Sequence, residues 1–91
     1  MTDLQNTAFL MCSEDYKERF AAEYWQLRIR LESLTRMIEK YRADTLTFTP
    51  TCSVHILECQ VESMLRYLRI LNLRAKIEHI NLSESVFYGK P

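Results

Sequence analysis

The sequence predicts an all-α protein in which a short N-terminal helix precedes a long antiparallel helical hairpin. The 91 residues include one Gly and two Pro, which are too few for a turn-rich β fold. Hydrophobic residues make up 47% of the chain, so it lacks the composition of a disordered protein. Two long stretches repeat apolar residues at steps of three and four, which is the spacing of one helix face. We therefore expect a single helical domain over residues 1–91.

Residues 1–12 are predicted to form a short leader helix that folds back onto the rest of the chain. Thr2 and Gln5 have the spacing of a capping box. The segment lacks the positively charged start and the long apolar run of a signal peptide.

Residues 13–43 are predicted to form the first long helix, with Ser13 as its N-cap. Acidic residues lie early and basic residues late in this segment, an order that suits the helix dipole. A helix of roughly 45 Å, at about 1.5 Å per residue, must bury its apolar stripe against other elements. The stripe consists of Tyr16, Phe20, Tyr24, Leu27, Leu31, Leu34, Ile38 and Tyr41.

Residues 44–53 are predicted to form a loop, because Thr is frequent there and Pro50 disfavours a helical conformation at the residue before it. Phe48 is expected to anchor this loop in the core. Ser53 is expected to cap the second long helix, residues 54–80. The stripe of this helix consists of Val54, Leu57, Val61, Met64, Leu68, Leu71 and Ala75. Long helices joined by a short loop pack antiparallel, and residues 81–91 remain as a tail.

Both long helices also carry apolar residues away from these stripes. A two-helix hairpin cannot cover these additional residues, so either the termini or another subunit must do so. We expect another subunit to cover at least one set, because a chain of this size builds only a small core. The residues are Trp25 and Ile29 in the first helix, and Ile70, Leu73, Ile77 and Ile80 in the second.

Charge and composition argue against several functional classes. Lys+Arg and Asp+Glu balance at twelve each, so we expect no general attraction for a DNA or RNA polymer or for an anionic membrane. No stretch approaches the roughly 20 apolar residues that span a membrane. A Gly-rich phosphate loop, a nucleophile elbow and an HExxH motif are all absent. We therefore expect no catalytic residues, no enzyme activity and no cofactor.

Three cysteines could indicate a metal site or reduced thiols. Cys52, His55 and Cys59 form a C-x2-H-x3-C cluster, in which the last two residues share a helix face. A structural zinc site needs four ligands, and His79 lies at the far end of the predicted helix. We therefore favour loop and core thiols beside a surface histidine, without a metal. An odd number of cysteines without a secretion signal is typical of a cytoplasmic protein.

Aromatic and basic residues border the core stripes. Tyr16, Arg19 and Arg30 lie beside the first stripe, and residues 66–76 carry four positive charges and no negative charge. Rings that stack on bases and guanidinium groups that bind phosphates can hold a small nucleotide at a subunit seam. The alternative is that these side chains only extend along a helix interface with their charged ends in water.

Two helical patterns resemble those of a known family. The first helix reads Y-x-x-R-F-x-x-E-x-x-x-L-x-x-R-x-x-x-L from Tyr16 to Leu34, and the second reads Q-x-x-x-M-x-x-Y-x-x-x-L-x-x-R from Gln60 to Arg74. Over about residues 13–80 the chain resembles the small all-helical phage proteins that block the bacterial CBASS defence by sequestering its cyclic oligonucleotide signals. The resemblance implies a compact homo-oligomer, a hexamer in known members, that acts without catalysis in the host bacterial cytoplasm.

The resemblance also implies a ligand and a site. Cyclic dinucleotides such as cyclic GMP–AMP are held between subunits by an aromatic and a basic residue of the first long helix. Tyr16 is the natural stacking residue here and Arg30 the natural phosphate partner, with Arg19 near them. Phe9 and Arg28 remain substitutes, because the register is open by a few residues.

Some members of that family also hold cyclic trinucleotides at a separate site where three subunits meet. Arg66, Arg69 and Arg74 are the candidates for such a second site in this chain.

The alternative function is a helical-hairpin interaction module, an inhibitor or adaptor that docks its second apolar face onto a host protein. It predicts that Trp25, Ile29, Ile70 and Leu73 stay exposed in the free protein. The sequestering function predicts that Tyr16 and Arg30 lie close together at a seam between copies.

Overall fold

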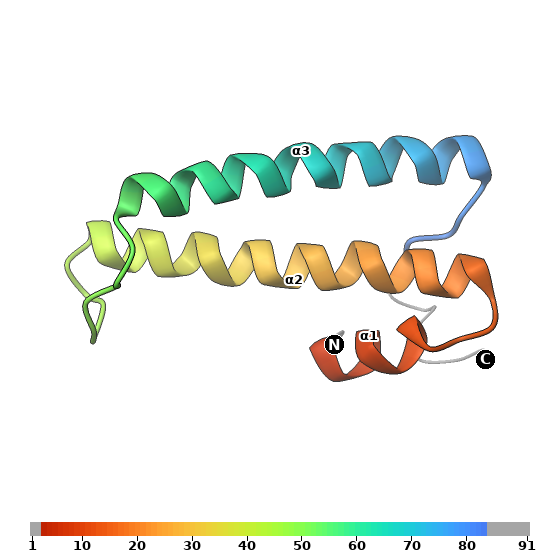
Figure 1. The fold of residues 1–91 in the computed structure, drawn as a ribbon, viewed down its shortest axis with the longest axis horizontal. Coiled ribbons are helices and arrows are strands. Elements are labelled where there is room, and N and C mark those ends of the chain that lie inside the picture. Colours follow the sequence, from red (N-terminus) through yellow and green to blue (C-terminus); the bar gives the residue numbers. More distant parts are fainter. Residues whose placement is uncertain (1–2, 84–91) are drawn as a thin grey trace.

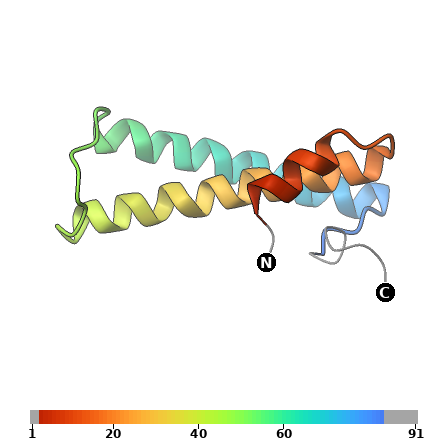
Figure 2. The same ribbon diagram turned by 90° about the horizontal axis from the view of Figure 1, so that it is seen from below.

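The computed structural model describes residues 3–83 of the chain. Within this range it contains three α-helices and no strand, which confirms the predicted all-α class: α1 (Leu4–Met11), α2 (Tyr16–Arg42) and α3 (Val54–Glu78). Helices α2 and α3 lie side by side and run in opposite directions, and α1 lies on the other side of α2 from α3 (Figure 1). The view turned by 90° shows α1 along the first half of α2 (Figure 2). Helix α2 is therefore the central element.

Helix α2 begins later than the sequence suggested, and the expectation that Ser13 caps it is wrong. The N-cap is Asp15, whose side chain accepts a hydrogen bond from the backbone N–H of Lys17 at 2.9 Å. The hydroxyl of Ser13 instead accepts from the backbone N–H of Asp15 at 3.0 Å and donates to Glu18 Oε1 at 2.5 Å. Ser13 thus closes the turn before the helix. A carboxylate at the cap also interacts favourably with the positive end of the helix dipole.

Two further helix starts are capped by short polar side chains. Asp3 caps α1 and accepts from the backbone N–H of Asn6 at 2.9 Å; Thr2, half of the expected capping box, lies outside the described residues. Ser53 caps α3, as predicted, and accepts from the backbone N–H of Ile56 at 3.3 Å.

Helix α3 ends at Glu78, two residues before the predicted end. His79 adopts a left-handed conformation with φ 58° and ψ 47°, and the chain then turns back towards α2. Ile80 is consequently buried in the core, so the expectation that it belongs to an outward face is wrong. The indole Nε1 of Trp25 donates to the carbonyl oxygen of Leu82 at 2.8 Å, which joins this segment to α2.

The core lies between the two long helices and is built mainly from the predicted stripes. Trp25, Leu34, Val61 and Leu68 are partly buried against it, together with Leu82. Burial of these apolar surfaces is the main driving force for the association of α2 and α3. The core cluster comprises Phe20, Tyr24, Leu27, Leu31, Met64, Leu71, Ala75 and Ile80.

The loop between α2 and α3 does not insert into this core. Phe48 is 55% exposed, so the prediction that it anchors the loop is wrong. It lines a shallow pocket with Met37 and Lys40 of α2 and with Leu46 of the loop. The loop therefore folds along the flank of α2, which leaves Phe48 at the surface.

Candidate functional site

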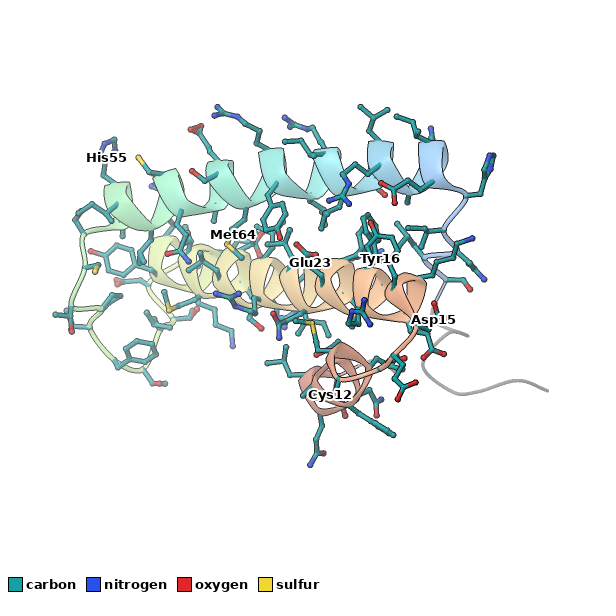
Figure 3. The ribbon with its side chains drawn as sticks, turned by 45° about the vertical axis from the view of Figure 1, so that its right-hand side comes forward. Cys12, Asp15, Tyr16, Glu23, His55 and Met64 are labelled. Atoms are coloured by element: carbon teal, nitrogen blue, oxygen red, sulfur yellow. The ribbon has the colours of Figure 1, made fainter. Side chains whose placement is uncertain are left out.

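Four side chains from two helices meet where α2 begins and α3 ends. Tyr16 and Phe20 come from α2, and Arg74 and Glu78 come from α3. Each pair is spaced by one helical turn, so both members project from the same side of their helix. Tyr16 lies on the side of α2 that faces α3 (Figure 3). We refer to these four residues as the Tyr16–Arg74 cluster.

A closed set of hydrogen bonds joins the polar groups of the Tyr16–Arg74 cluster. The hydroxyl of Tyr16 donates to Glu78 Oε1 at 2.8 Å and accepts from Arg74 Nη2 at 2.8 Å. Arg74 Nε donates to Glu78 Oε2 at 3.2 Å. The carboxylate of Glu78 therefore occupies donors of both Tyr16 and Arg74, as a bound anion would.

Aromatic contacts hold the same group from the apolar side. The guanidinium carbon of Arg74 lies 4.8 Å from the centre of the Phe20 ring, an arrangement that permits a cation–π interaction. The rings of Tyr16 and Phe20 meet edge to face with their centres 6.2 Å apart. Phe20 is buried, whereas Tyr16 is 46% exposed. One face of the cluster is therefore anchored in the core while the other remains open to solvent.

The hydrogen bonds shift the pKa values of the cluster. The bond to Glu78 raises the pKa of Tyr16, and it also raises the pKa of Arg74. The hydroxyl of Tyr16, followed by Arg74, lowers the pKa of Glu78. Near neutral pH the cluster therefore contains a neutral phenol, a cation and an anion. An incoming anion must compete with Glu78 for the two donors.

The predicted phosphate ligand Arg30 lies far from Tyr16 within one chain. The two residues are separated by about 21 Å along the helix axis, at about 1.5 Å per residue. Arg30 is exposed, and its side chain forms no hydrogen bond or ion pair with another residue of the range 3–83. Only a second subunit could bring an Arg30 side chain to Tyr16, and their juxtaposition stays a prediction.

Arg28 is held within its own chain. Its Nη1 donates to the hydroxyl of Tyr24 and its Nε donates to Glu32 Oε2, both at 3.3 Å. Its guanidinium carbon also lies 4.8 Å from the centre of the Trp25 ring. These contacts make Arg28 a weaker candidate for a phosphate ligand than Arg30.

The remaining first-site candidates lie near the start of α2 or on α1. Arg19 is exposed, and its Nη1 donates to the carbonyl oxygen of Ser13 at 2.6 Å. Phe9 is on α1 and is 72% exposed. Its ring is therefore accessible, but among the described residues it makes no aromatic or cation–π contact with the Tyr16–Arg74 cluster.

The three arginines predicted for a second site lie in α3 but do not form one group. Arg74 belongs to the Tyr16–Arg74 cluster. Arg66 and Arg69 are exposed, and their side chains have no hydrogen-bond or ion-pair partner in the part of the chain that the structure describes. The structure therefore places Arg74 beside Tyr16, which was a candidate for the cyclic dinucleotide site.

Sequence reasoning missed Phe20 and Glu78 as members of the cluster. Their i,i+4 spacing to Tyr16 and Arg74 was a usable signal. Which residues of α2 and α3 lie opposite each other could not be predicted from the sequence, because this depends on the relative position of the two helices along their axes.

The three thiols and His55 do not form a metal centre in the described residues. Cys59 Sγ lies 3.9 Å from His55 Nε2, and no group of three His, Cys, Asp or Glu side chains within residues 3–83 is arranged to hold a metal ion. Cys12, Cys52 and Cys59 are all free and exposed, so the expectation of a core thiol at Cys59 is wrong. His55 lies at the opposite end of the hairpin from Tyr16 (Figure 3).

Comparison with known proteins gives one family and no individual relative. No curated protein and no solved structure matches the chain. No helix within residues 3–83 is long and apolar enough to cross a membrane. The family named Sequestin matches residues 14–77, which contain most of α2 and α3 and three of the four side chains of the Tyr16–Arg74 cluster. Because the match extends over more than two thirds of the chain, this protein belongs to the Sequestin family.

Proposed function

We propose that this protein is a phage-encoded sponge that binds cyclic dinucleotides and thereby blocks CBASS signalling in the cytoplasm of the infected bacterium. Membership of the Sequestin family is compatible with a sequestering role. The observation that carries the proposal is the Tyr16–Arg74 cluster, in which an exposed aromatic ring and a guanidinium group lie side by side. Cyclic trinucleotides are the second ligand class that we propose, with Arg66 and Arg69 as their contacts.

Recognition needs a ring for the base and donors for the phosphate. The exposed ring of Tyr16 can stack on a base, because every base presents a π face. The donors that Glu78 occupies suit a phosphodiester equally well, because a guanidinium group binds carboxylates and phosphates in the same forked geometry. We propose that the ligand phosphate takes the place of the Glu78 carboxylate.

Assembly of several copies completes the proposed site. A cyclic dinucleotide carries two phosphates and needs at least two cationic groups, while the chain has no net charge. Copies of one arginine related by a two-fold axis supply both cations locally. Arg30 is our candidate for this role, and a homohexamer is the assembly that we propose.

Sequestration requires no chemical change in the ligand. A sponge acts by mass action, so it needs enough copies and slow release to keep the free messenger below the threshold of its effector. We propose that the protein is not an enzyme and needs neither a cofactor nor a metal.

Calorimetric titration with cyclic GMP–AMP tests this function directly. We expect binding, an oligomeric mass by light scattering, and recovery of the intact nucleotide after heat denaturation. Arg30→Ala should weaken binding strongly. Arg36→Ala is the matched control, because Arg36 is also an exposed arginine of α2 without a partner among residues 3–83. A titration without heat change, together with a monomeric mass, would overturn the proposal.

One observation favours the alternative of an inhibitor or adaptor that docks on a host protein. Ile70 and Leu73 are more than half exposed, as this alternative requires. The alternative also requires an exposed Trp25, but this residue is partly buried against the core. A monomeric protein that binds no nucleotide and copurifies with one host protein in a fixed ratio would favour this second function.

A further inference from the structure

The side of α3 that points away from α2 carries a regular stripe, which we call the outer face. Its residues recur at steps of three and four along the whole helix, the heptad spacing of a coiled-coil seam. All seven are exposed, and Ile77 is 67% exposed. The outer face comprises Ile56, Cys59, Ser63, Arg66, Ile70, Leu73 and Ile77.

No described helix covers the outer face. Helix α1 lies on the far side of α2 (Figure 1), and the segment after His79 turns back onto α2, where Ile80 is buried. Ile56, Ile70 and Leu73 are each at least half exposed. Four of the seven residues are large, apolar and exposed, and exposed apolar side chains gathered on one helix face are typical of a surface that binds another protein.

Charges beside the outer face are separated along the helix. Glu62 lies in the first half of α3, whereas Arg69 and Lys76 lie in the second half. Glu58 is directed to α2 instead, where it forms an ion pair with Arg42. A second α3 in the opposite direction places Glu62 of each copy near the basic half of the other. A parallel α3 would instead place like charges side by side, including one Arg66 against another. The charge distribution is therefore self-complementary only in the antiparallel orientation.

We propose that a second copy of this chain covers the outer face with its own outer face, antiparallel and about a two-fold axis. In this arrangement Leu73 packs against Ile56 of the second copy, and Ile70 packs against Cys59 of the second copy. Glu62 lies beside Arg69 of the second copy at the edge. Each contact occurs twice, as two-fold symmetry requires.

Arg66 determines the register of the pair. In the proposed register it faces Ser63 of the second copy, a polar neighbour at the centre of the seam. A slide of one heptad in either direction would place Arg66 against Ile70 or Ile56, which costs free energy because a charge is then covered by apolar groups. The proposed register matches apolar with apolar and polar with polar residues.

The pairing deepens the assembly part of the proposed function and rests on it, and it does not involve the proposed cyclic dinucleotide site. It covers Arg66, so in this assembly Arg66 would not be available to a cyclic trinucleotide. In the pair, the two Tyr16–Arg74 clusters lie at opposite ends, about 30 Å apart along the seam at about 1.5 Å per residue. The outer face therefore leaves both clusters open. A hexamer that binds ligand between subunits would use a different interface for the ligand.

Disulfide trapping tests the pairing and its register. Cys12→Ser and Cys52→Ser remove two exposed free thiols and leave Cys59. Ile70→Cys in this background should give a covalent dimer under mild oxidation. Within one chain, positions 59 and 70 are roughly 16 Å apart along the helix at about 1.5 Å per residue, whereas a disulfide needs Cα atoms within about 7 Å. Any disulfide must therefore join two chains.

Ile77→Cys in the same background is the matched control, because it would meet Cys59 only after a slide of one heptad. We expect the Ile70→Cys protein to cross-link at least about tenfold faster than the control, since docked thiols meet at a high effective concentration. Equal rates for both variants would overturn the pairing. Rapid cross-linking of the background through Cys59 alone would indicate a parallel seam and would also overturn it.

A charge exchange supplies a second readout that needs no new thiol. Glu62→Arg and Arg69→Glu should each raise the dissociation constant of the pair, measured by sedimentation, because each places like charges together at the edge. The double variant should restore the affinity. Failure of the double variant to recover would contradict the proposed neighbours. Titration of the same variants with cyclic GMP–AMP shows separately whether binding at the Tyr16–Arg74 cluster survives.

Discussion

At the scale of single residues, a comparison of the two exposed tyrosines of α2 tests whether Tyr16 binds the ligand. Tyr16 is 46% exposed beside Arg74, and Tyr41 is 45% exposed at the other end of the same helix. Tyr16→Ala should weaken cyclic dinucleotide binding by roughly tenfold, because stacking on a base contributes about 1–3 kcal/mol. Tyr41→Ala is the matched control and should bind normally in the same calorimetric titration. Equal affinities for both variants would move the site away from the Tyr16–Arg74 cluster.

Glu78 makes the folded state sensitive to acid. Its pKa is lowered by the hydrogen bond from Tyr16 and by Arg74, so its ionised form stabilises the folded chain above the ordinary glutamate pKa of roughly 4.3. This contribution is lost as the pH falls through the lower pKa of the folded state. The stability advantage over Glu78→Gln should therefore be largest near neutral pH and disappear in acid.

Urea unfolding of both proteins at neutral and acidic pH measures this difference. The charged groups of the cluster are open to solvent, so we expect a small effect that high salt reduces further. Glu14→Gln is the control, because Glu14 has no hydrogen-bond partner among residues 3–83. A stability difference for Glu78→Gln that does not change with pH would show that the carboxylate does not act through its charge.

At the scale of elements, the start of α2 depends on one carboxylate. Asp15→Ala removes the oxygen that accepts from the backbone N–H of Lys17 and should lower the free energy of unfolding by about 1 kcal/mol. Glu14→Ala removes the same charge one residue earlier and should cost less, because it breaks no cap. Chemical denaturation followed by circular dichroism compares the two variants. A similar loss in both would mean that the dipole interaction, rather than the cap, stabilises this helix end.

The helices themselves were largely predictable from the sequence. Apolar spacing located the two long helices, because a helix that buries one face must repeat at that spacing. The short first helix was expected from a capping-box spacing at Thr2 and Gln5, whereas its N-cap is Asp3. Ser53 was identified as a cap from its residue type and position. Ser13 was not a cap, because Asp15 lies nearer to the first turn and its oxygen accepts from the helix N–H group. Short-range competition of this kind decides helix ends to within a few residues.

At the scale of the whole molecule, the sequence predicted apolar residues that need a partner, and the single folded chain leaves some of them exposed. Ile70 and Leu73 were expected to need a cover, and both stay exposed in the folded chain. Ile80 was expected to need the same cover, but the turn at His79 buries it against α2. The antiparallel pairing through the outer face would cover the first two residues and leave the Tyr16–Arg74 cluster accessible to a ligand.

Residue order by itself determined the helical class and the two faces of each long helix, because periodicity is a local property of the chain. It also indicated which aromatic and basic side chains border the core. Only the tertiary structure decided that Tyr16 meets Arg74 and Glu78, and that Arg30 lies a long way along α2. The physical reason is that contacts between helices depend on how far one slides along the other, and packing of the whole core determines that distance.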